Sequence, residues 1–400
     1  MRPRRAIRID LMNFLLPFCA FTSAVATRAM DPLVSSLATE FGISIAAAAL
    51  AVTMFALPYS IGQPVLGPAG DHYGKIRILK ICLWVQTASL ILVAVAPTFE
   101  LLLVGRFIGG IAGGGLMPIA LAIVADKVAP SQRQAAIARN VTGSLSGLIL
   151  AASGAGLMAV WLNWRAIFAV ATAISLTASI LVTLQLKETV VATRHIRLSD
   201  AFDSYRQIIT KRRAWICFIA VMFEGIALFG MFPFIAPVLQ SRGMGGPAEA
   251  GFMITACGIG SLIFTFLVRR LLRVMSRYGL MIAGGTLAMM GLLALAFAAP
   301  LPWLAFFFAL SGFGYMMVHN SIHAEVSELT DTARTSAFAL HSCFFFTGQA
   351  LGPLLFGAGM GMIGASGILI VYGAILFLIG PIISVLLRRA RATGSGALAF

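Results

Sequence analysis

The stretch Gly67–Arg77, GPAGDHYGKIR, is a short polar turn between two long apolar runs. Its glycines permit positive φ angles, its aspartate can end a helix or join an ion pair, and its cations are typical of the cytoplasmic face of a membrane. A related turn follows 205 residues later, where Tyr278-Gly279 repeats Tyr73-Gly74. The turn therefore predicts long apolar segments on either side and a second half of the chain that is built like the first.

The composition is that of a protein that crosses a membrane several times. Hydrophobic residues make up 60% of the 400 residues and charged residues only 11%, whereas a soluble domain carries about 25% charged residues. The five cysteines are scattered within apolar runs and indicate no disulfide framework. The net charge of +15 does not predict nucleic-acid binding, because the cations lie between hydrophobic runs and form no basic stripe with interleaved aromatic residues.

Twelve segments are long and apolar enough to cross a bilayer, which takes about 20 residues. The first follows a group of arginines and has no clear small-residue cleavage site, so we expect a retained transmembrane helix rather than a signal peptide. The predicted spans are residues 11–34, 45–67, 78–97, 100–125, 140–160, 166–186, 214–239, 250–268, 280–299, 303–324, 335–358 and 367–387.

The distribution of cations predicts the orientation of these spans. With the N-terminus in the cytoplasm, 25 of the 29 lysines and arginines fall in cytoplasmic segments, and the outer loops hold only Arg165 and Arg242. This asymmetry satisfies the positive-inside rule, and one missed span would invert every later loop. We therefore predict a multi-pass protein of a bacterial-type inner membrane, with the N- and C-termini both in the cytoplasm.

The longest polar segment divides the chain into two similar halves. Ala324-Glu325, after the tenth span, repeats Ala125-Asp126, after the fourth. Parallel six-helix halves imply a pseudo-two-fold axis along the membrane normal and a cavity between the halves. The predicted fold is all-α, with twelve transmembrane helices in two pseudo-symmetric six-helix bundles. The predicted domains are an N-terminal bundle at residues 1–186, a cytoplasmic central loop at 187–213 and a C-terminal bundle with a short basic tail at 214–400.

Ionisable residues inside the predicted spans are costly to bury and are therefore candidate functional residues. Glu224 is the strongest, since a midplane carboxylate with no partner nearby in the sequence could load and release a proton near neutral pH. It could instead face a water-filled cavity or a structural arginine. Arg28 and Asp31 are three residues apart and can pair, either structurally or in a direct role. Arg106 could bind an anionic substrate or a carboxylate across the cavity.

Histidines lie in the tenth and eleventh predicted spans. His319 and His323 are four residues apart, which would suit a metal site, but no cysteine or acidic cluster within the span supports one. The sequence therefore favours a polar cavity or a helix contact for His319 and predicts no metal. It contains no P-loop, nucleophile elbow, HExxH or pair of catalytic carboxylates, so we predict no enzymatic activity and no cofactor.

The opening turn is similar to the signature of the major facilitator superfamily, Gly-x-x-x-Asp-(Arg/Lys)-x-Gly-(Arg/Lys). His72 stands where the family has a permanent cation. In the family this loop stabilises the outward-open state. The resemblance therefore implies a conformational latch that is formed by Gly67, Asp71, Gly74, Lys75 and Arg77. Because Ser276 stands opposite Asp71 in the repeat, the sequence predicts a latch on the N-terminal half alone.

Other motifs extend the resemblance over the whole chain. The sequence Gly105–Gly110, GRFIGG, looks like the motif of the fourth span that the family associates with proton coupling. Trp164-Arg165 is similar to the usual loop between the fifth and sixth spans. The Gly-Pro pair of the antiporter motif is missing from the fifth span and occurs in the eleventh. The chain most closely resembles the twelve-span drug/proton antiporter-like branch.

This resemblance implies secondary active transport of a small, partly hydrophobic organic compound by alternating access, coupled to protons and directed outward. Glu224 or Asp31 would carry the proton, and Arg106 would tune that carboxylate. The expected partners are the substrate, protons and the lipid bilayer, and the expected state is a monomer. The expected cavity wall includes Met54, Phe55, Phe223, Phe229, Tyr315 and His319.

Two alternatives to efflux stay open from the sequence. One is a proton-coupled uptake symporter for a sugar, an organic acid or an amino acid. The other is a non-transporting membrane sensor or assembly factor on the same fold.

Overall fold

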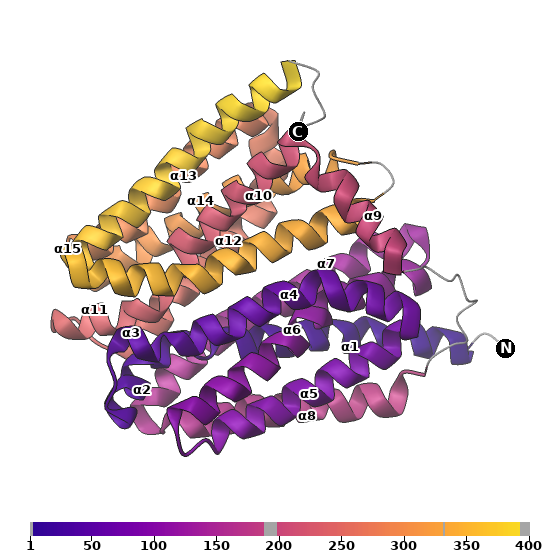
Figure 1. The fold of residues 1–400 in the computed structure, drawn as a ribbon, viewed down its shortest axis with the longest axis horizontal. Helices are drawn as coiled ribbons and strands as arrows, with labels where there is room; N and C mark the ends of the chain where they lie inside the picture. The colour runs from indigo at the N-terminus through magenta and orange to yellow at the C-terminus, as the bar shows by residue number, and fades with distance from the viewer. Residues whose placement is uncertain (1–2, 188–197, 331–332, 393–400) are drawn as a thin grey trace.

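The computed structural model describes residues 3–187, 198–330 and 333–392. Within these residues the chain is helical throughout, with no strand, as predicted. The helices form two bundles that lie side by side, one indigo to magenta and the other rose to yellow (Figure 1). The predicted all-α fold of two six-helix bundles is confirmed.

The helices of the first half are followed by one short connecting helix. The first half comprises α1 (Pro3–Arg28), η1 (Asp31–Leu33), α2 (Val34–Phe41), α3 (Ile45–Ala48), α4 (Leu50–Tyr73), α5 (Lys75–Ala94), α6 (Phe99–Lys127), α7 (Pro130–Trp161) and α8 (Trp164–Gln185), and the connection holds α9 (Leu198–Ile209). The second half comprises α10 (Arg212–Glu224), η2 (Gly225–Phe229), η3 (Phe232–Phe234), α11 (Ile235–Ser241), α12 (Pro247–Val274), α13 (Arg277–Ala296), α14 (Leu301–Ser327) and α15 (Arg334–Ala392).

Ten helical segments among the described residues are long and apolar enough to cross a membrane. One of them, α15, contains both of the last two predicted spans, which meet at a sharp bend (Figure 1). The bend is at Gly364, whose φ of 74° is readily adopted only by glycine. The opening turn has the same device, since Gly74 separates α4 from α5 with φ 102°. Glycines with positive φ therefore set where these helices end or bend.

The two halves meet along two pairs of helices. α7 packs against α12 on one side, and α4 packs against α15 on the other. Glycines allow close approach at the first contact, because a Cβ on Gly251 would meet the carbonyl oxygen of Ala152 at 2.5 Å. At the second contact the Thr53 hydroxyl donates to the carbonyl oxygen of Ala350, at 2.8 Å. Both contacts cross from one half to the other.

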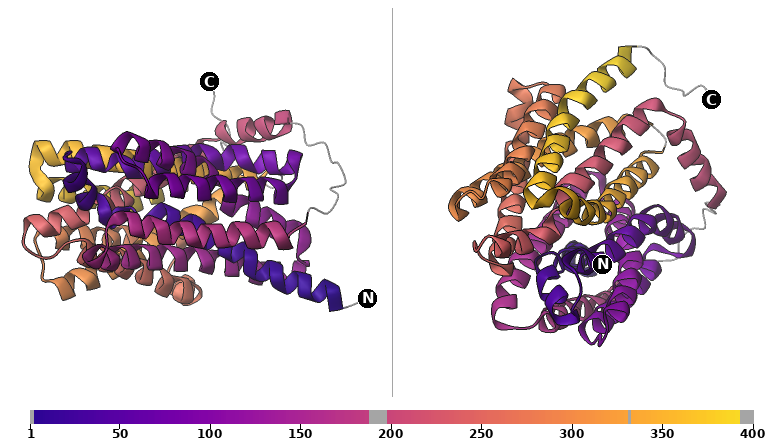
Figure 2. Two further views of the ribbon diagram at one scale, coloured as in Figure 1. Left: turned by 90° about the horizontal axis from the view of Figure 1, so that it is seen from below. Right: turned by 60° about the vertical axis from the view of Figure 1, so that its left-hand side comes forward.

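The halves converge at one end and separate toward the other. At the convergent end, α2 and α3 lie beside α11 and the bend of α15 (Figure 1). The opposite end carries α9 and the start of α1, as the turned views also show (Figure 2). We call these the closed end and the α9 end. At the α9 end, the hydroxyl of Tyr205 in α9 donates to the carbonyl oxygen of Pro64 in α4, at 2.9 Å.

An irregular turn follows α10 in the second half. Directly after Glu224 the chain widens into one π-helical turn, η2, which packs against α15. Glycines on both elements make this contact possible, because a Cβ on Gly225 would strike the carbonyl oxygen of Phe345, and a Cβ on Gly348 that of Met222. Single π-helical turns are frequent at functional sites.

Candidate functional site

A cavity of about 980 Å³ lies between the two halves and is lined by both. Its lining runs from Arg28 and Tyr315, deep in the molecule, to Asp71 and Lys75 at the α9 end. Most of the wall is apolar, with a small number of polar groups among aromatic and aliphatic side chains. Tyr59 of the first half lies against Phe346 of the second, with ring centroids 4.1 Å apart. Such a lining suits a ligand that is largely hydrophobic.

The predicted Arg28–Asp31 pair is present at the deep end of the cavity. Nη1 of Arg28 donates to Oδ2 of Asp31 at 3.3 Å, and Nη2 donates to Oε1 of Gln349 at 2.6 Å. The guanidinium also lies 4.4 Å from the ring centroid of Phe229, a favourable cation–π position. Asp31 is fully buried, and its Oδ1 has no hydrogen-bond partner among the described residues. Since Gln349 belongs to α15, Arg28 links the two halves.

Glu224 has a partner that the sequence order conceals. Its side chain is 1% exposed, and its Oε2 lies 2.9 Å from Nδ1 of His319 in α14. The two residues are 95 positions apart, so each could be recognised as a buried polar group in the sequence, but their contact could not. Tyr315, one turn before His319, lies in the cavity wall. Glu224 and His319 lie outside the cavity lining.

Arg106 is buried within the first half and does not line the cavity. Its Nε donates to the carbonyl oxygen of Ala51 at 2.9 Å, and its Nη1 donates to that of Ala26 at 2.7 Å. The guanidinium also covers the ring of Phe55, 4.2 Å from its centroid. Glycines of α6 bring that helix close to α4, which turns the arginine onto α4 and α1. In this geometry Arg106 joins α1, α4 and α6.

The predicted wall residues divide into two groups. Phe229 and Tyr315 line the cavity and contact each other edge to face, with centroids 5.3 Å apart. The prediction for Phe223 is wrong, because its side chain is 39% exposed and lies outside the lining. Successive residues of a helix point about 100° apart, so the turn that buries Glu224 leaves Phe223 on the outer surface. Met54 and Phe55 also lie outside the lining.

The predicted latch residues form ionic contacts at the rim of the cavity. Lys75 Nζ lies 3.0 Å from Oδ1 of Asp71 and 2.6 Å from Oδ2 of Asp126. These contacts join the turn between α4 and α5 to the end of α6. Gly67 has open space where a Cβ would lie, whereas Gly74 is required by its positive φ. Arg77 is exposed at the start of α5.

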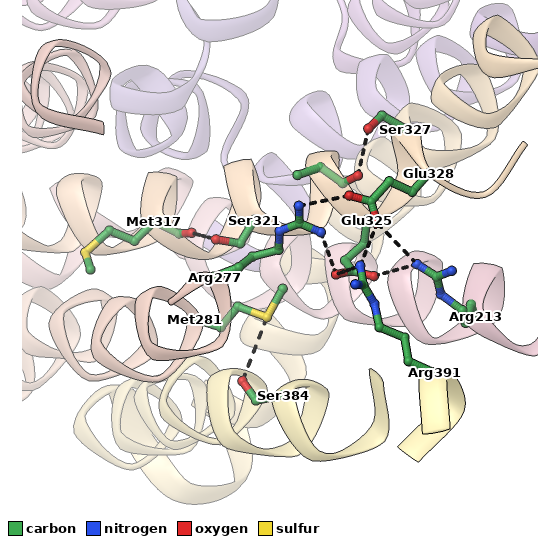
Figure 3. Close-up of polar contacts among 11 residues, drawn as sticks. Arg213, Arg277, Met281, Met317, Ser321, Glu325, Ser327, Glu328, Ser384 and Arg391 are labelled. Carbon is green, nitrogen blue, oxygen red and sulfur yellow. Dashed lines mark hydrogen bonds and ion pairs between the residues drawn. The ribbon is translucent and has the colours of Figure 1, made fainter. Parts of the chain in front are cut away.

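The second half has its own ionic cluster at the same end, which we call the Glu325 cluster (Figure 3). Glu325 is fully buried and accepts hydrogen bonds of 2.8 Å from each of three arginines. Two of these arginines also donate hydrogen bonds to Glu328, at 2.9 and 2.6 Å, and the third lies 3.7 Å from it. The hydrogen bond from Arg277 holds the pKa of Glu328 below its ordinary value of 4.5. The cluster comprises Arg213, Arg277, Arg391, Glu325 and Glu328.

The sequence predicted a latch on the N-terminal half alone, and the structure adds ionic contacts at the same end of the second half. Ser276, which the repeat aligns with Asp71, is a helix cap whose Oγ accepts a hydrogen bond from the backbone N–H of Gly279, at 3.1 Å. The acidic groups come instead from α14, where Glu325 takes the place that Asp126 has in α6. Aligning the turns alone therefore missed them.

Comparison with known families agrees with this architecture. The family model described as Major Facilitator Superfamily matches residues 16–333 and 246–399. This chain belongs to the major facilitator superfamily. It is a multi-pass membrane protein of a transporter family, and the two matched segments overlap at residues 246–333.

Curated relatives are transporters of the same superfamily. The chain is 35% identical over 147 residues to mpsC, an MFS-type transporter of Macrophomina phaseolina, covering 36% of this chain and 29% of the relative. It is 23% identical over 258 residues to the uncharacterized MFS-type transporter YwfA of Bacillus subtilis, covering 62% and 61%. It is 29% identical over 195 residues to a triacylglyceride transporter of Mycolicibacterium hassiacum, covering 46% and 35%. The matched regions thus span less than two thirds of each relative.

Solved structures of superfamily members share the fold over nearly the whole chain. A bacterial homologue of the human lysosomal transporter Spinster, in an inward-facing and unoccupied conformation, aligns with a TM-score of 0.75 and 15% identity, covering 100% of both chains. A D-xylose-proton symporter aligns with a TM-score of 0.77 and 18% identity, covering 94% of this chain and 97% of that one. At these identities the likeness shows the fold alone.

Several cavity residues of this superfamily member were missed as site candidates. Tyr59 and Gln349 face the cavity, and Phe345 contacts both Phe229 and His319. A glutamine inside an apolar span is a usable signal, since buried amides need partners. An aromatic residue carries no such signal, because core and cavity positions of a membrane helix have the same composition.

Proposed function

We propose that this major facilitator superfamily member exports a small, partly hydrophobic organic compound in exchange for protons, by alternating access. The observation that carries the proposal is the cavity between the halves, whose apolar wall includes Arg28, the partner of the buried Asp31. With the orientation inferred from the cation distribution, the α9 end faces the cytoplasm. A compound dissolved in the cytoplasm or the inner leaflet would then reach the site in this state.

Asp31 is the proposed proton carrier. Its only charged hydrogen-bond partner among the described residues is Arg28, and Arg28 lines the cavity and holds Gln349 of the opposite half. Arg106 is the other nearby cation and lies behind it. A donor group of the substrate and a proton would compete for the ionised Asp31 carboxylate, so that each would weaken the binding of the other. Competition of this kind couples the proton to the substrate in both directions.

The wall chemistry supports a compound with aromatic or aliphatic bulk and few polar groups. Phe229, Tyr315, Phe345 and Phe346 supply ring faces and edges, and Gln63 and Gln349 supply amides. The cavity volume lies within the range of typical small-molecule sites, roughly 300–1,000 Å³. Some relatives are named triacylglyceride transporters, which supports a largely apolar compound.

The direction of coupling can be measured in proteoliposomes. A compound is first selected by its ability to raise the thermal unfolding midpoint of the purified protein in detergent. We expect an imposed pH gradient to drive that compound against the direction of proton flow. Accumulation in the same direction as the protons would establish symport and contradict the proposal. Failure to transport any stabilising compound would favour a sensor or an assembly factor on this fold.

The latch contributes a further prediction. Asp71→Asn leaves Lys75 with Asp126 as its remaining carboxylate, so we expect a several-fold loss of transport rate. Ser276→Ala is the matched control at the equivalent turn, where loss of a helix cap costs about 1 kcal/mol of stability without touching an ion pair. Initial rates at equal protein density would test this pair of variants. Equal effects of the two substitutions would refute a latch at the opening turn.

A further inference from the structure

Three histidines gather behind the cavity wall in the second half. His319 and His323 lie one turn apart on α14, and His341 comes from α15. One ring nitrogen of each lies within 4.8 Å of the corresponding nitrogens of the other two. The ring centroids are 4.4 to 5.2 Å apart. Three imidazoles in contact, drawn from two helices, make a donor set that neither helix carries alone.

The protein itself leaves ring nitrogens of this cluster unengaged. His341 is 1% exposed, and neither its Nδ1 nor its Nε2 has a hydrogen-bond partner among the described residues. Leaving a buried polar group unpaired costs about 1–3 kcal/mol. An apolar side chain would therefore be more stable than histidine at a position that serves packing alone. One of its ring nitrogens lies within 4.8 Å of those of His319 and His323, and a ligand shared by the three rings would use it.

Glu224 orients one member of the cluster. Its Oε2 is 2.9 Å from Nδ1 of His319, so that with Glu224 ionised Nδ1 is the protonated nitrogen and the lone pair is on Nε2. Histidines that bind metal ions usually donate their second N–H to a carboxylate in this way. A carboxylate beside the cluster also reduces the cost of placing a dication there.

We propose that His319, His323 and His341 bind one divalent transition-metal ion of the zinc class, with Glu224 orienting His319. Imidazole nitrogen suits Zn²⁺, Cu²⁺ and Ni²⁺, whereas Ca²⁺ and Mg²⁺ require oxygen ligands. Tetrahedral zinc with bonds of 2.0–2.1 Å places its nitrogen ligands about 3.3 Å apart. Rotation of the histidine side chains closes the difference from the separation of up to 4.8 Å.

The position of the cluster indicates how an ion would reach it and what its binding would do. Tyr315, Phe338 and Phe345 line the cavity, and each also contacts a ring of the cluster, with centroids 5.0 to 5.4 Å apart. An ion therefore has to pass only one layer of side chains from the cavity. Once bound, it would hold α14 and α15 together next to the substrate wall.

Cobalt titration of the full-length protein tests the site directly. The protein is purified in detergent without a histidine tag, stripped with a chelator and titrated with Co²⁺, whose visible absorption reports nitrogen ligation at low coordination number. We expect a band that saturates at one equivalent of Co²⁺ and disappears on addition of Zn²⁺. His341→Asn should abolish the band, and Glu224→Gln should weaken Co²⁺ binding roughly 10- to 100-fold. His72→Asn, an exposed histidine elsewhere, should leave it unchanged.

A second measurement keeps the test decisive if one variant folds poorly. Zn²⁺ should raise the thermal unfolding midpoint of the unmodified protein and of His72→Asn, but not that of His323→Gln, which keeps a polar side chain at a less buried position. The proposal is overturned if the unmodified protein gives no cobalt band, or if the band survives in both His341→Asn and His323→Gln.

Discussion

Asp31→Asn should abolish proton-driven accumulation of the substrate while leaving substrate exchange intact. The amide has nearly the volume of the carboxylate, and its oxygen can still accept the hydrogen bond from Arg28. It cannot take up or release a proton. Net transport under a pH gradient should therefore fall at least about tenfold, because in an antiporter the proton-bound protein is the form that returns to the substrate-loading conformation. Counterflow of substrate against substrate needs no proton cycle and should persist.

The measurement compares the two assays in the same proteoliposomes. Glu40→Gln is a suitable control, because Glu40 is a half-exposed carboxylate that binds Trp164 and Arg165 near the closed end, away from the cavity. If Asp31→Asn does not fold, the double variant Arg28→Gln/Asp31→Asn removes both charges together and avoids an unpaired buried cation. Proton-driven transport at the unmodified rate in either variant would exclude Asp31 as the carrier.

The fold could be predicted from patterns that are spread along the whole chain, so a misplaced boundary of one segment does not change the result. Apolar segments of sufficient length, separated by cations at alternate loops, determine how many helices cross the membrane and in which direction. The bend at Gly364 falls between the last two predicted spans, as expected for two separate crossings. Local details escaped, such as the π-helical turn Gly225–Phe229 inside the seventh predicted span.

The site could be predicted less completely from the sequence, because it depends on pairs of residues that are distant in the sequence. Burial of Glu224 and His319 could be predicted from the cost of polar groups in apolar spans, but their contact depends on the packing of α10 against α14. Arg106 shows a different limit of the sequence. Its charge suggested a role at the substrate and its motif a role in proton coupling, whereas its Nε and Nη1 donate to backbone carbonyls of two neighbouring helices inside the first half, outside the cavity lining.

Glu325→Gln should destabilise the protein far more than Glu328→Gln, although both side chains bind the same arginines. Glu325 is fully buried and accepts from Arg213, Arg277 and Arg391, whereas the side chain of Glu328 is 43% exposed. An amide in place of the buried carboxylate turns one end of the group into a donor facing guanidinium donors. Breaking a buried pair of this kind costs about 3–5 kcal/mol, and breaking an exposed one costs about 1 kcal/mol or less.

The comparison is a thermal unfolding measurement in detergent at neutral pH, where both carboxylates are ionised. The Glu325 variant should unfold at a clearly lower temperature, and the Glu328 variant close to the unmodified protein. Since the cluster joins the ends of α10, α13, α14 and α15, its loss should also let those helices move independently at the α9 end (Figure 3). Equal unfolding midpoints for the two variants would mean that the arginines are held by solvent and by Glu328. The second half would then not depend on Glu325 to move as one body.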